Sequence, residues 1–189
     1  GAALLLAAGA AAATAAVVAS SAPARVVTAG FPSGGTNPGI FTDTCTRSTT
    51  APNDPIMMPG MTGMSMQHDF FGNPAVDAST TAATLRGGST TCSTTADASA
   101  YWTPVVYQHG SALTPQRTLL YWRTPGAIAA SARTMPEGIS LIAGNETATS
   151  PQSTSVVDWT CTTTAADPNP GRAELPHDCP SGSQLRLVI

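Results

Sequence analysis

The chain contains no lysine, and only 10% of its 189 residues are charged. Without a cluster of basic residues it has no electropositive face that could hold nucleic acid, so we expect no such partner. A net charge of -3 is too small to indicate another charged partner. The sequence also lacks a GxSxG motif, which argues against the serine nucleophile of an α/β-hydrolase.

The amino-terminal segment, residues 1–24, has no charged side chain and consists mostly of alanine and leucine. Ala22-Pro23-Ala24 then gives the small-x-small pattern that precedes signal-peptide cleavage, and Arg25 is the first charged residue. We therefore expect part of a secretory signal peptide and a secreted, extracellular protein. The alternative is an uncleaved membrane anchor, since about 20 apolar residues can cross a bilayer.

Residues 25–39 are rich in Gly, Pro, Ser and Asn and are predicted to form a linker. Residues 40–189 are then long enough for one domain with a core of its own. The sequence lacks a start methionine and ends in the strand-like pattern of Gln184–Ile189. We expect it to be a fragment that is truncated at both ends.

Four cysteines form an even set: Cys45, Cys92, Cys161 and Cys179. In an oxidising compartment two disulfides are the default, and three connectivities are open. We favour Cys45–Cys92 and Cys161–Cys179, because each pair closes a loop bracketed by turn residues. A zinc site is less expected, because no CxxC pair is present.

Several segments are rich in β-branched and aromatic residues and are bounded by Gly, Pro, Asn or Ser, as strands usually are. Pro104 restricts the first of these segments, residues 100–107, to an edge strand or a bulged strand. One short helix is expected at 80–86, capped by Ser79 or Thr80, and a second helical segment at 127–133. The expected fold is a mainly β sandwich or barrel-like domain with long loops, one or two short helices and disulfides. The expected strands are 100–107, 117–124, 139–143, 153–163 and 184–189.

The densest chemistry lies in residues 54–73, which hold five of the six methionines, a His-Asp pair and two phenylalanines. Pro55, Pro59, Gly60 and Gly63 oppose regular helix here. We therefore predict a long loop. Loops of this length in a compact domain are usually functional or disordered, and the apolar residues argue against disorder.

The blocks Asp54-Pro55-Ile56, Pro59-Gly60 and His68-Asp69-Phe70-Phe71-Gly72-Asn73 resemble the signature of the domain-of-unknown-function family numbered 1,996. The resemblance continues through Leu85–Cys92, Ala100–Pro104, Pro136–Gly144, Trp159–Cys161 and Cys179-Pro180. Members are secreted fungal and bacterial proteins with no settled activity. This chain has Met66 where many members have a histidine, and it lacks their further His-bearing segment, so it holds only part of any histidine cluster.

His68 and Asp69 are the candidate catalytic residues. The role expected of His68 is general base or metal ligand, and the role expected of Asp69 is acid or base. Because they are adjacent in an extended segment, their side chains point to opposite faces and form no relay with each other. The alternative is structural: a buried, hydrogen-bonded histidine and an aspartate that pins the backbone. Any further ligand or acid must come from His109, His177 or carboxylates such as Asp77, Asp97 and Asp178.

The methionines suggest a second hypothesis, because thioethers select Cu(I) and imidazole accepts either copper state. The ligands of such a copper site, or of another divalent metal, would be Met61, Met64, Met66 and His68. The plainer explanation is that methionine fills irregular gaps beneath a loop.

The paired aromatics Tyr101-Trp102 and Tyr121-Trp122 lie on expected strands, so one ring of each pair points outward. An outward ring can stack on a sugar, although one core ring and one partly exposed ring is the commoner arrangement. The candidate substrate contacts are Asn73, Arg86, Trp102 and Trp122.

Together these features predict a secreted protein that associates with polysaccharide or cell-wall glycan, by binding or hydrolysis, through the loop of residues 65–73. Whether it is an enzyme stays open. The alternatives are extracellular copper binding and a non-catalytic structural module of the cell surface.

Overall fold

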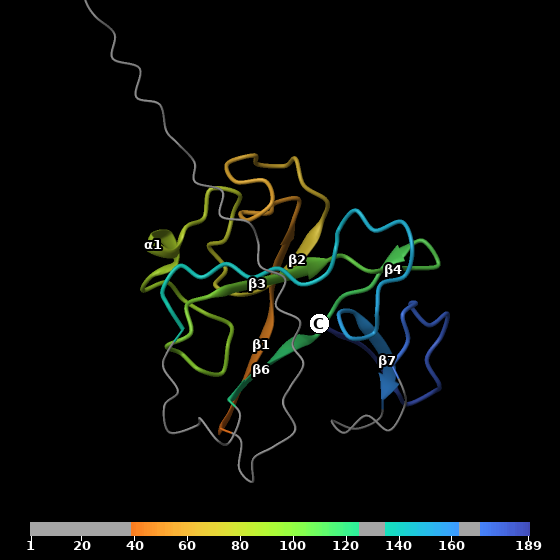
Figure 1. Ribbon diagram of the computed structural model, residues 1–189. Coiled ribbons are helices and arrows are strands. Elements are labelled where there is room, and N and C mark those ends of the chain that lie inside the picture. Colours follow the sequence, from red (N-terminus) through yellow and green to blue (C-terminus); the bar gives the residue numbers. More distant parts are fainter. Residues whose placement is uncertain (1–38, 125–134, 163–170) are drawn as a thin grey trace, which may run out of the picture.

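The computed structural model describes residues 39–124, 135–162 and 171–189. The prediction of a mainly β domain is confirmed (Figure 1). Its main element is a four-stranded antiparallel sheet in the order β3-β2-β1-β6. The strands are β1 (Gly39–Ala51), β2 (His68–Gly72), β3 (Ala100–Pro104) and β6 (Arg117–Thr124).

Two small sheets complete the described fold. β4 (Tyr107–Gln108) pairs with β5 (Ser111–Ala112), and β7 (Asp158–Thr162) pairs with β8 (Gln184–Val188). The helix α1 (Ala82–Leu85) is one turn long. Its N-cap is Thr81, one residue beyond the predicted cap, and Thr84 completes a capping box.

The long strand β1 joins the two halves of the main sheet. Residues 39–46 pair with β6, whereas residues 47–51 pair with β2, and a bulge lies between Arg47 and Thr49. A bulge adds one residue to one strand, so it reverses which side chains face each side of the sheet. Asp43 and Cys45 thus share one face with Phe71, while Thr49 shares the other with Phe70.

The strand β2 corrects the prediction of a loop that runs to Asn73. His68–Gly72 lies between β1 and β3, and all five residues are buried. Such a strand shows no alternation of polar and apolar residues, because both of its faces are covered. The loop itself is real but shorter: no helix or strand lies between Ala51 and His68.

The other predicted strands were correct in part. β3 lies at the sheet edge, as expected, but it ends at Pro104 rather than at residue 107, and β6 and β8 lie where they were predicted. Residues 139–143 form no strand, and within the described part of the other segment, residues 153–162, only Asp158–Thr162 does so. Ile139, Leu141 and Ile142 are all exposed, so this apolar run is not packed against the core as the prediction of a strand assumed.

The core of the main sheet is built on a disulfide. Cys45 and Cys92 are bonded to each other and pack with Phe71, Tyr101 and Leu120. A second disulfide joins Cys161 to Cys179, so the favoured connectivity is confirmed. Small domains with modest cores often depend on such links.

Asp43 is buried beside this core. Burial raises the pKa of its carboxyl, but hydrogen bonds from the Ser93 hydroxyl and the N–H groups of Thr94 and Thr44 outweigh burial and hold the pKa below its ordinary value. Burial raises the pKa of Tyr101, whose hydroxyl donates to Asp97 over 2.8 Å.

The predicted signal peptide, nearly all of the predicted linker and the expected helix at 127–133 lie outside the described residues. Within 39–124, 135–162 and 171–189, no helix is long and apolar enough to cross a membrane.

Candidate functional site

Residues 52–67, here called the methionine loop, connect β1 to β2 and are closed at the base by a hydrogen bond from Ser65 N–H to Pro52 O. Met61 N–H donates to Met58 O and Met64 N–H to Met61 O, which makes two successive turns. Gly60 and Gly63 occupy the third position of these two turns, and each has a φ of 75°. A type II turn requires this left-handed φ at that position, so glycine is needed twice.

His68 lies at the start of β2, directly under the base of this loop, and is 3% exposed. Its Nδ1 lies 3.0 Å from the Asn53 carbonyl oxygen, so Nδ1 carries the proton and donates. The Ser65 hydroxyl is 3.5 Å from the same nitrogen. The ring also packs edge-on against Phe70. The imidazole therefore links both ends of the loop to the sheet.

Asp54 is a neighbour of His68 that was not chosen from the sequence. Its Oδ2 lies 3.9 Å from His68 Nε2, beyond hydrogen-bonding distance. Its Oδ1 accepts from the N–H groups of Ile56 and Met57, which starts the loop with an Asx turn. In the sequence, Asp54 precedes Pro55 at the start of the loop, and an Asp-Pro pair indicates a turn rather than a catalytic acid.

Asp69 points to the opposite face of β2, as predicted from its position next to His68. The Thr50 hydroxyl donates to Asp69 Oδ1 over 2.5 Å, and the Arg47 guanidinium lies 3.7 Å from the same oxygen. Both partners belong to β1. The buried carboxylate thus holds the two strands together, and His68 and Asp69 do not share a site.

Asn73, a candidate substrate contact, is fully buried directly after β2. Its side-chain amide donates to the carbonyl oxygens of Leu85 and Ala98, and its Oδ1 accepts from Ala75 N–H. A substrate could reach Asn73 only after the surrounding loops open.

Arg86, another candidate substrate contact, is exposed. Its guanidinium forms an ion pair with Glu137, so it is accessible to solvent but already paired.

The two aromatic pairs divide between the faces of the sheet, as alternation requires. Tyr101 packs on the disulfide core, whereas Trp102 lies with its ring centroid 5.8 Å from that of Phe70 on the other face. Tyr121 is 51% exposed, and Trp122 is partly buried on the opposite face. Tyr121 is thus the most accessible of these four rings, and it was not chosen from the sequence.

Four of the five methionines of the loop are exposed rather than packed beneath it. Met57, Met61, Met64 and Met66 are between 46% and 64% exposed. The plainer explanation of the methionine cluster is therefore not supported at these four positions. The buried His68 points under the loop rather than outward with them.

Two other groups of side chains bring metal-ligating atoms together in the described residues. In the first, Asp43 and Asp97 lie by Cys45 and Cys92, whose sulfurs are bonded to each other and so offer no thiolate. The second consists of His109, His177 and Asp178 and is exposed.

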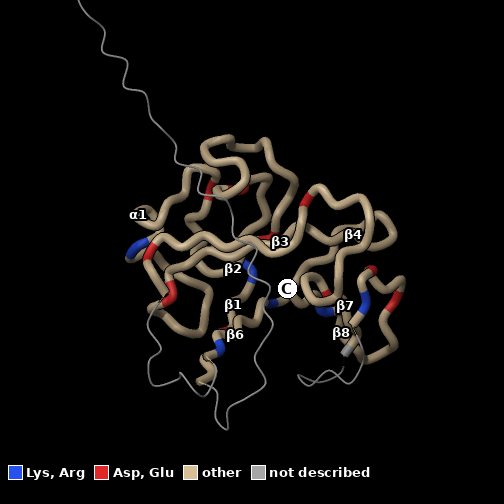
Figure 2. The backbone as a smooth tube through the Cα atoms, in the orientation of Figure 1, with Lys and Arg blue, Asp and Glu red and all other residues tan. Residues whose placement is uncertain are grey.

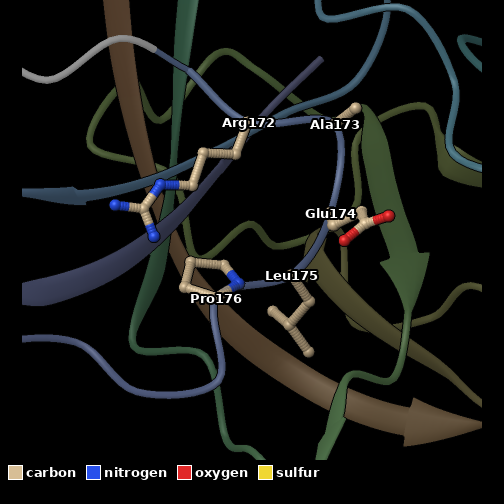
Figure 3. Close-up of a pocket in the computed structure, with 5 residues that line it drawn as sticks. All are labelled: Arg172, Ala173, Glu174, Leu175 and Pro176. Atoms are coloured by element: carbon tan, nitrogen blue, oxygen red, sulfur yellow. The ribbon is translucent and has the colours of Figure 1, made fainter.

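A hollow of about 350 Å³ is lined by the consecutive residues Arg172, Ala173, Glu174, Leu175 and Pro176 (Figure 3). None of the candidate site residues lines it. Figure 2 shows the positions of the few charged residues spread along the described backbone rather than gathered in one region. The candidate residues therefore define a braced loop and a sheet surface, and this hollow does not unite them.

Comparison with known proteins gives a family but no activity. No curated protein and no solved structure matches the chain. A family model described as a domain of unknown function, DUF1996, matches residues 54–189. This range covers every strand from β2 to β8 and most of the sequence. The chain therefore belongs to the DUF1996 family.

Proposed function

We propose that this protein is exported and binds polysaccharide or cell-wall glycan without hydrolysing it. Export is supported by the two disulfides and by the uncharged amino-terminal segment. The observation that carries the binding proposal is an exposed aromatic ring, Tyr121, on an open sheet face.

The proposed binding surface is the Tyr121 face of the β1–β6 pair. Thr42 lies directly across from Tyr121 and Ile40 across from Arg123. Opposed residues in an antiparallel pair share a face, as do residues two apart on one strand. The Arg123 guanidinium lies over the Tyr121 ring at 5.6 Å. All four side chains are exposed.

This combination suits a sugar. The flat tyrosine ring offers apolar contact to the C–H face of a pyranose, while its hydroxyl reaches a polar edge. The guanidinium and the threonine hydroxyl supply hydrogen bonds to sugar hydroxyls. A strand pair is rigid, so the contacts are held before the ligand arrives.

The buried carboxylates favour binding over hydrolysis. Glycoside hydrolysis ordinarily uses two carboxyl groups that flank the scissile bond. Asp54 and Asp69 are both at least 95% buried, and each already accepts hydrogen bonds from the protein. They support the loop and the sheet, and they do not face an open cleft.

Retention on insoluble polysaccharides tests the proposal. Tyr121→Ala should abolish retention, whereas Trp122→Ala, on the opposite face, should leave it nearly unchanged. Tyr107→Ala is the matched control, because Tyr107 is 56% exposed on the separate β4–β5 hairpin. Retention of Tyr121→Ala at the wild-type level, or equal loss in the Tyr107 control, would rule out this surface.

A second candidate function is Cu(I) binding by the methionine loop, favoured by the exposure of its methionines. Thioether sulfur is a soft ligand that selects Cu(I). Met61 and Met64 stand at the ends of successive turns and Met66 follows two residues later, so their side chains project from one short, braced segment. His68, being buried, would need to move to join them.

Competition with a chromogenic Cu(I) chelator tests this candidate. Replacing Met61, Met64 and Met66 together by leucine should abolish competition while the fold is kept, since leucine is similar in volume. Met135→Leu is the control, because Met135 is 43% exposed outside the loop. Unchanged competition by the triple variant would end the copper hypothesis.

A further inference from the structure

The two remaining histidines of the chain, His109 and His177, meet at one carboxylate although 68 positions separate them. His109 lies in the turn of the β4–β5 hairpin, whereas His177 and Asp178 precede Cys179 near the carboxyl end of the described chain. Neither segment contributes to the methionine loop or to the Tyr121 face.

The hairpin turn holds His109 outward. Gln108 pairs with Ser111, so His109 and Gly110 form a two-residue turn, with φ of 50° and 79°. Positive φ at both positions is the pattern of a type I′ turn, which normally selects Asn-Gly. His109 is the one non-glycine residue with positive φ in the described ranges.

Two links fix the second segment beside the hairpin. The Gln108 side-chain amide donates to the His177 carbonyl oxygen. The Cys161–Cys179 disulfide ties the residue after Asp178 to β7. The three side chains are therefore brought together by the fold and not by their spacing in the sequence.

The geometry places one possible ligand atom from each residue within 4.8 Å of the others. His109 Nε2 lies 3.5 Å from Asp178 Oδ1, and His177 Nδ1 lies 2.6 Å from Oδ2. The imidazole centroids are 4.5 Å apart. Two imidazoles thus converge on the two oxygens of one carboxylate.

We propose that His109, His177 and Asp178 form a binding site for a divalent transition-metal ion of the Zn²⁺ and Cu²⁺ class. Two imidazole nitrogens and one carboxylate oxygen are a donor set that such ions accept, whereas soft Cu(I) prefers thioether and thiolate. Three protein ligands leave coordination positions for water or a further ligand.

Ion pairing among the three side chains does not by itself explain why they converge. All three side chains are more than half exposed, and exposed pairs of this kind contribute little to stability. A shared cation satisfies all three side chains with both imidazoles neutral.

Isothermal titration calorimetry with ZnCl₂ on the full chain, produced without a histidine tag, tests the site. We expect one Zn²⁺ per chain. Asp178→Asn, which keeps size and shape, should weaken binding at least about tenfold. His109→Asn removes the imidazole but suits the left-handed turn, so it should weaken Zn²⁺ binding without disturbing the hairpin.

Asp77→Asn is the control, because it neutralises an exposed carboxylate that belongs to no such group. Electron paramagnetic resonance of the Cu²⁺-loaded protein gives a second readout: nitrogen hyperfine coupling should decrease in His109→Asn and in His177→Gln. Wild-type protein that binds no Zn²⁺, or Asp178→Asn and His109→Asn variants that bind it like wild type, would overturn the proposal. If the His109→Asn variant does not fold, Zn²⁺ binding by the Asp178→Asn variant, in which only an exposed side chain is changed, tests the proposal by itself.

Discussion

At the scale of single residues, the buried polar side chains of and around β2 explain the His-Asp-Phe-Phe-Gly-Asn signature as a structural unit. His68 binds the base of the methionine loop, Asp69 binds β1, and Asn73 ties down two further loops. Each of the three side chains makes at least one hydrogen bond inside the protein. A buried polar group is costly to leave unpaired, so these residue types are demanded by the fold itself.

Asp43 gives a prediction about acid stability. Its folded pKa is lowered, so its carboxylate stabilises the protein above the unfolded pKa of about 3.9, and this stabilisation is lost as pH falls through the folded value. Asp43→Asn should lower the free energy of unfolding at pH 7 by about 1–3 kcal/mol and by less at pH 3.

Urea unfolding at the two pH values measures the difference. Asp77→Asn is the control, because Asp77 is exposed and should contribute little at either pH. A loss for Asp43→Asn that is equal at pH 7 and pH 3 would show that the charge of Asp43 is not what stabilises the fold.

At the scale of elements, β6, β8, the edge position of β3 and both disulfides were predictable from local pattern. Leu185 and Leu187 alternate with polar neighbours, and turn residues bracket each cysteine pair. The central strands were not predictable. β2 has both faces covered, and β1 is rich in threonine and changes partner at a bulge, so neither shows a two-residue period over its length.

The candidate site shows the same limit. The sequence indicated that His68 and Asp69 face opposite sides, and this followed from strand geometry alone. It gave no sign that Asp54 approaches His68, or that His109 meets His177, because those contacts depend on how loops fold over the sheet. The exposure of the methionines was likewise fixed by two glycine-dependent turns.

Gly72 is the residue on which the end of β2 depends. Its φ is 78°, and a Cβ atom there would overlap the Ser99 carbonyl oxygen. Gly72→Ala should therefore lower the free energy of unfolding by at least about 2 kcal/mol. Gly60→Ala separates the two causes, since Gly60 has φ of 75° but open space around it, and should cost about 1 kcal/mol.

Chemical denaturation followed by tryptophan fluorescence measures both variants. Equal losses in Gly72→Ala and Gly60→Ala would mean that backbone strain alone matters and that the contact with Ser99 does not.

At the scale of the whole molecule, the domain extends beyond the range matched by the family model. The match begins at Asp54, yet β1 lies between β2 and β6 and supplies Cys45 of the core disulfide. Asn53, which receives the His68 hydrogen bond, also precedes the match. Residues 39–53 are therefore part of the same folding unit as the matched segment.

The molecule divides its polar chemistry between an interior that fixes the fold and exposed surfaces that carry the proposed binding groups. The interior holds the signature residues of β2, whereas the Tyr121 face, the methionine loop and the group of His109, His177 and Asp178 are all accessible. On this account, a substitution in the interior changes stability, and one at the surface changes binding.

The most direct test of this division is the His68→Ala variant, measured by urea unfolding and by retention on polysaccharide. We predict that the free energy of unfolding falls by about 2–4 kcal/mol, because a buried, hydrogen-bonded ring is lost, while the folded variant retains polysaccharide as well as wild type. Stability within about 0.5 kcal/mol of wild type, together with loss of retention or of a hydrolytic activity, would contradict the account and place His68 in a working site.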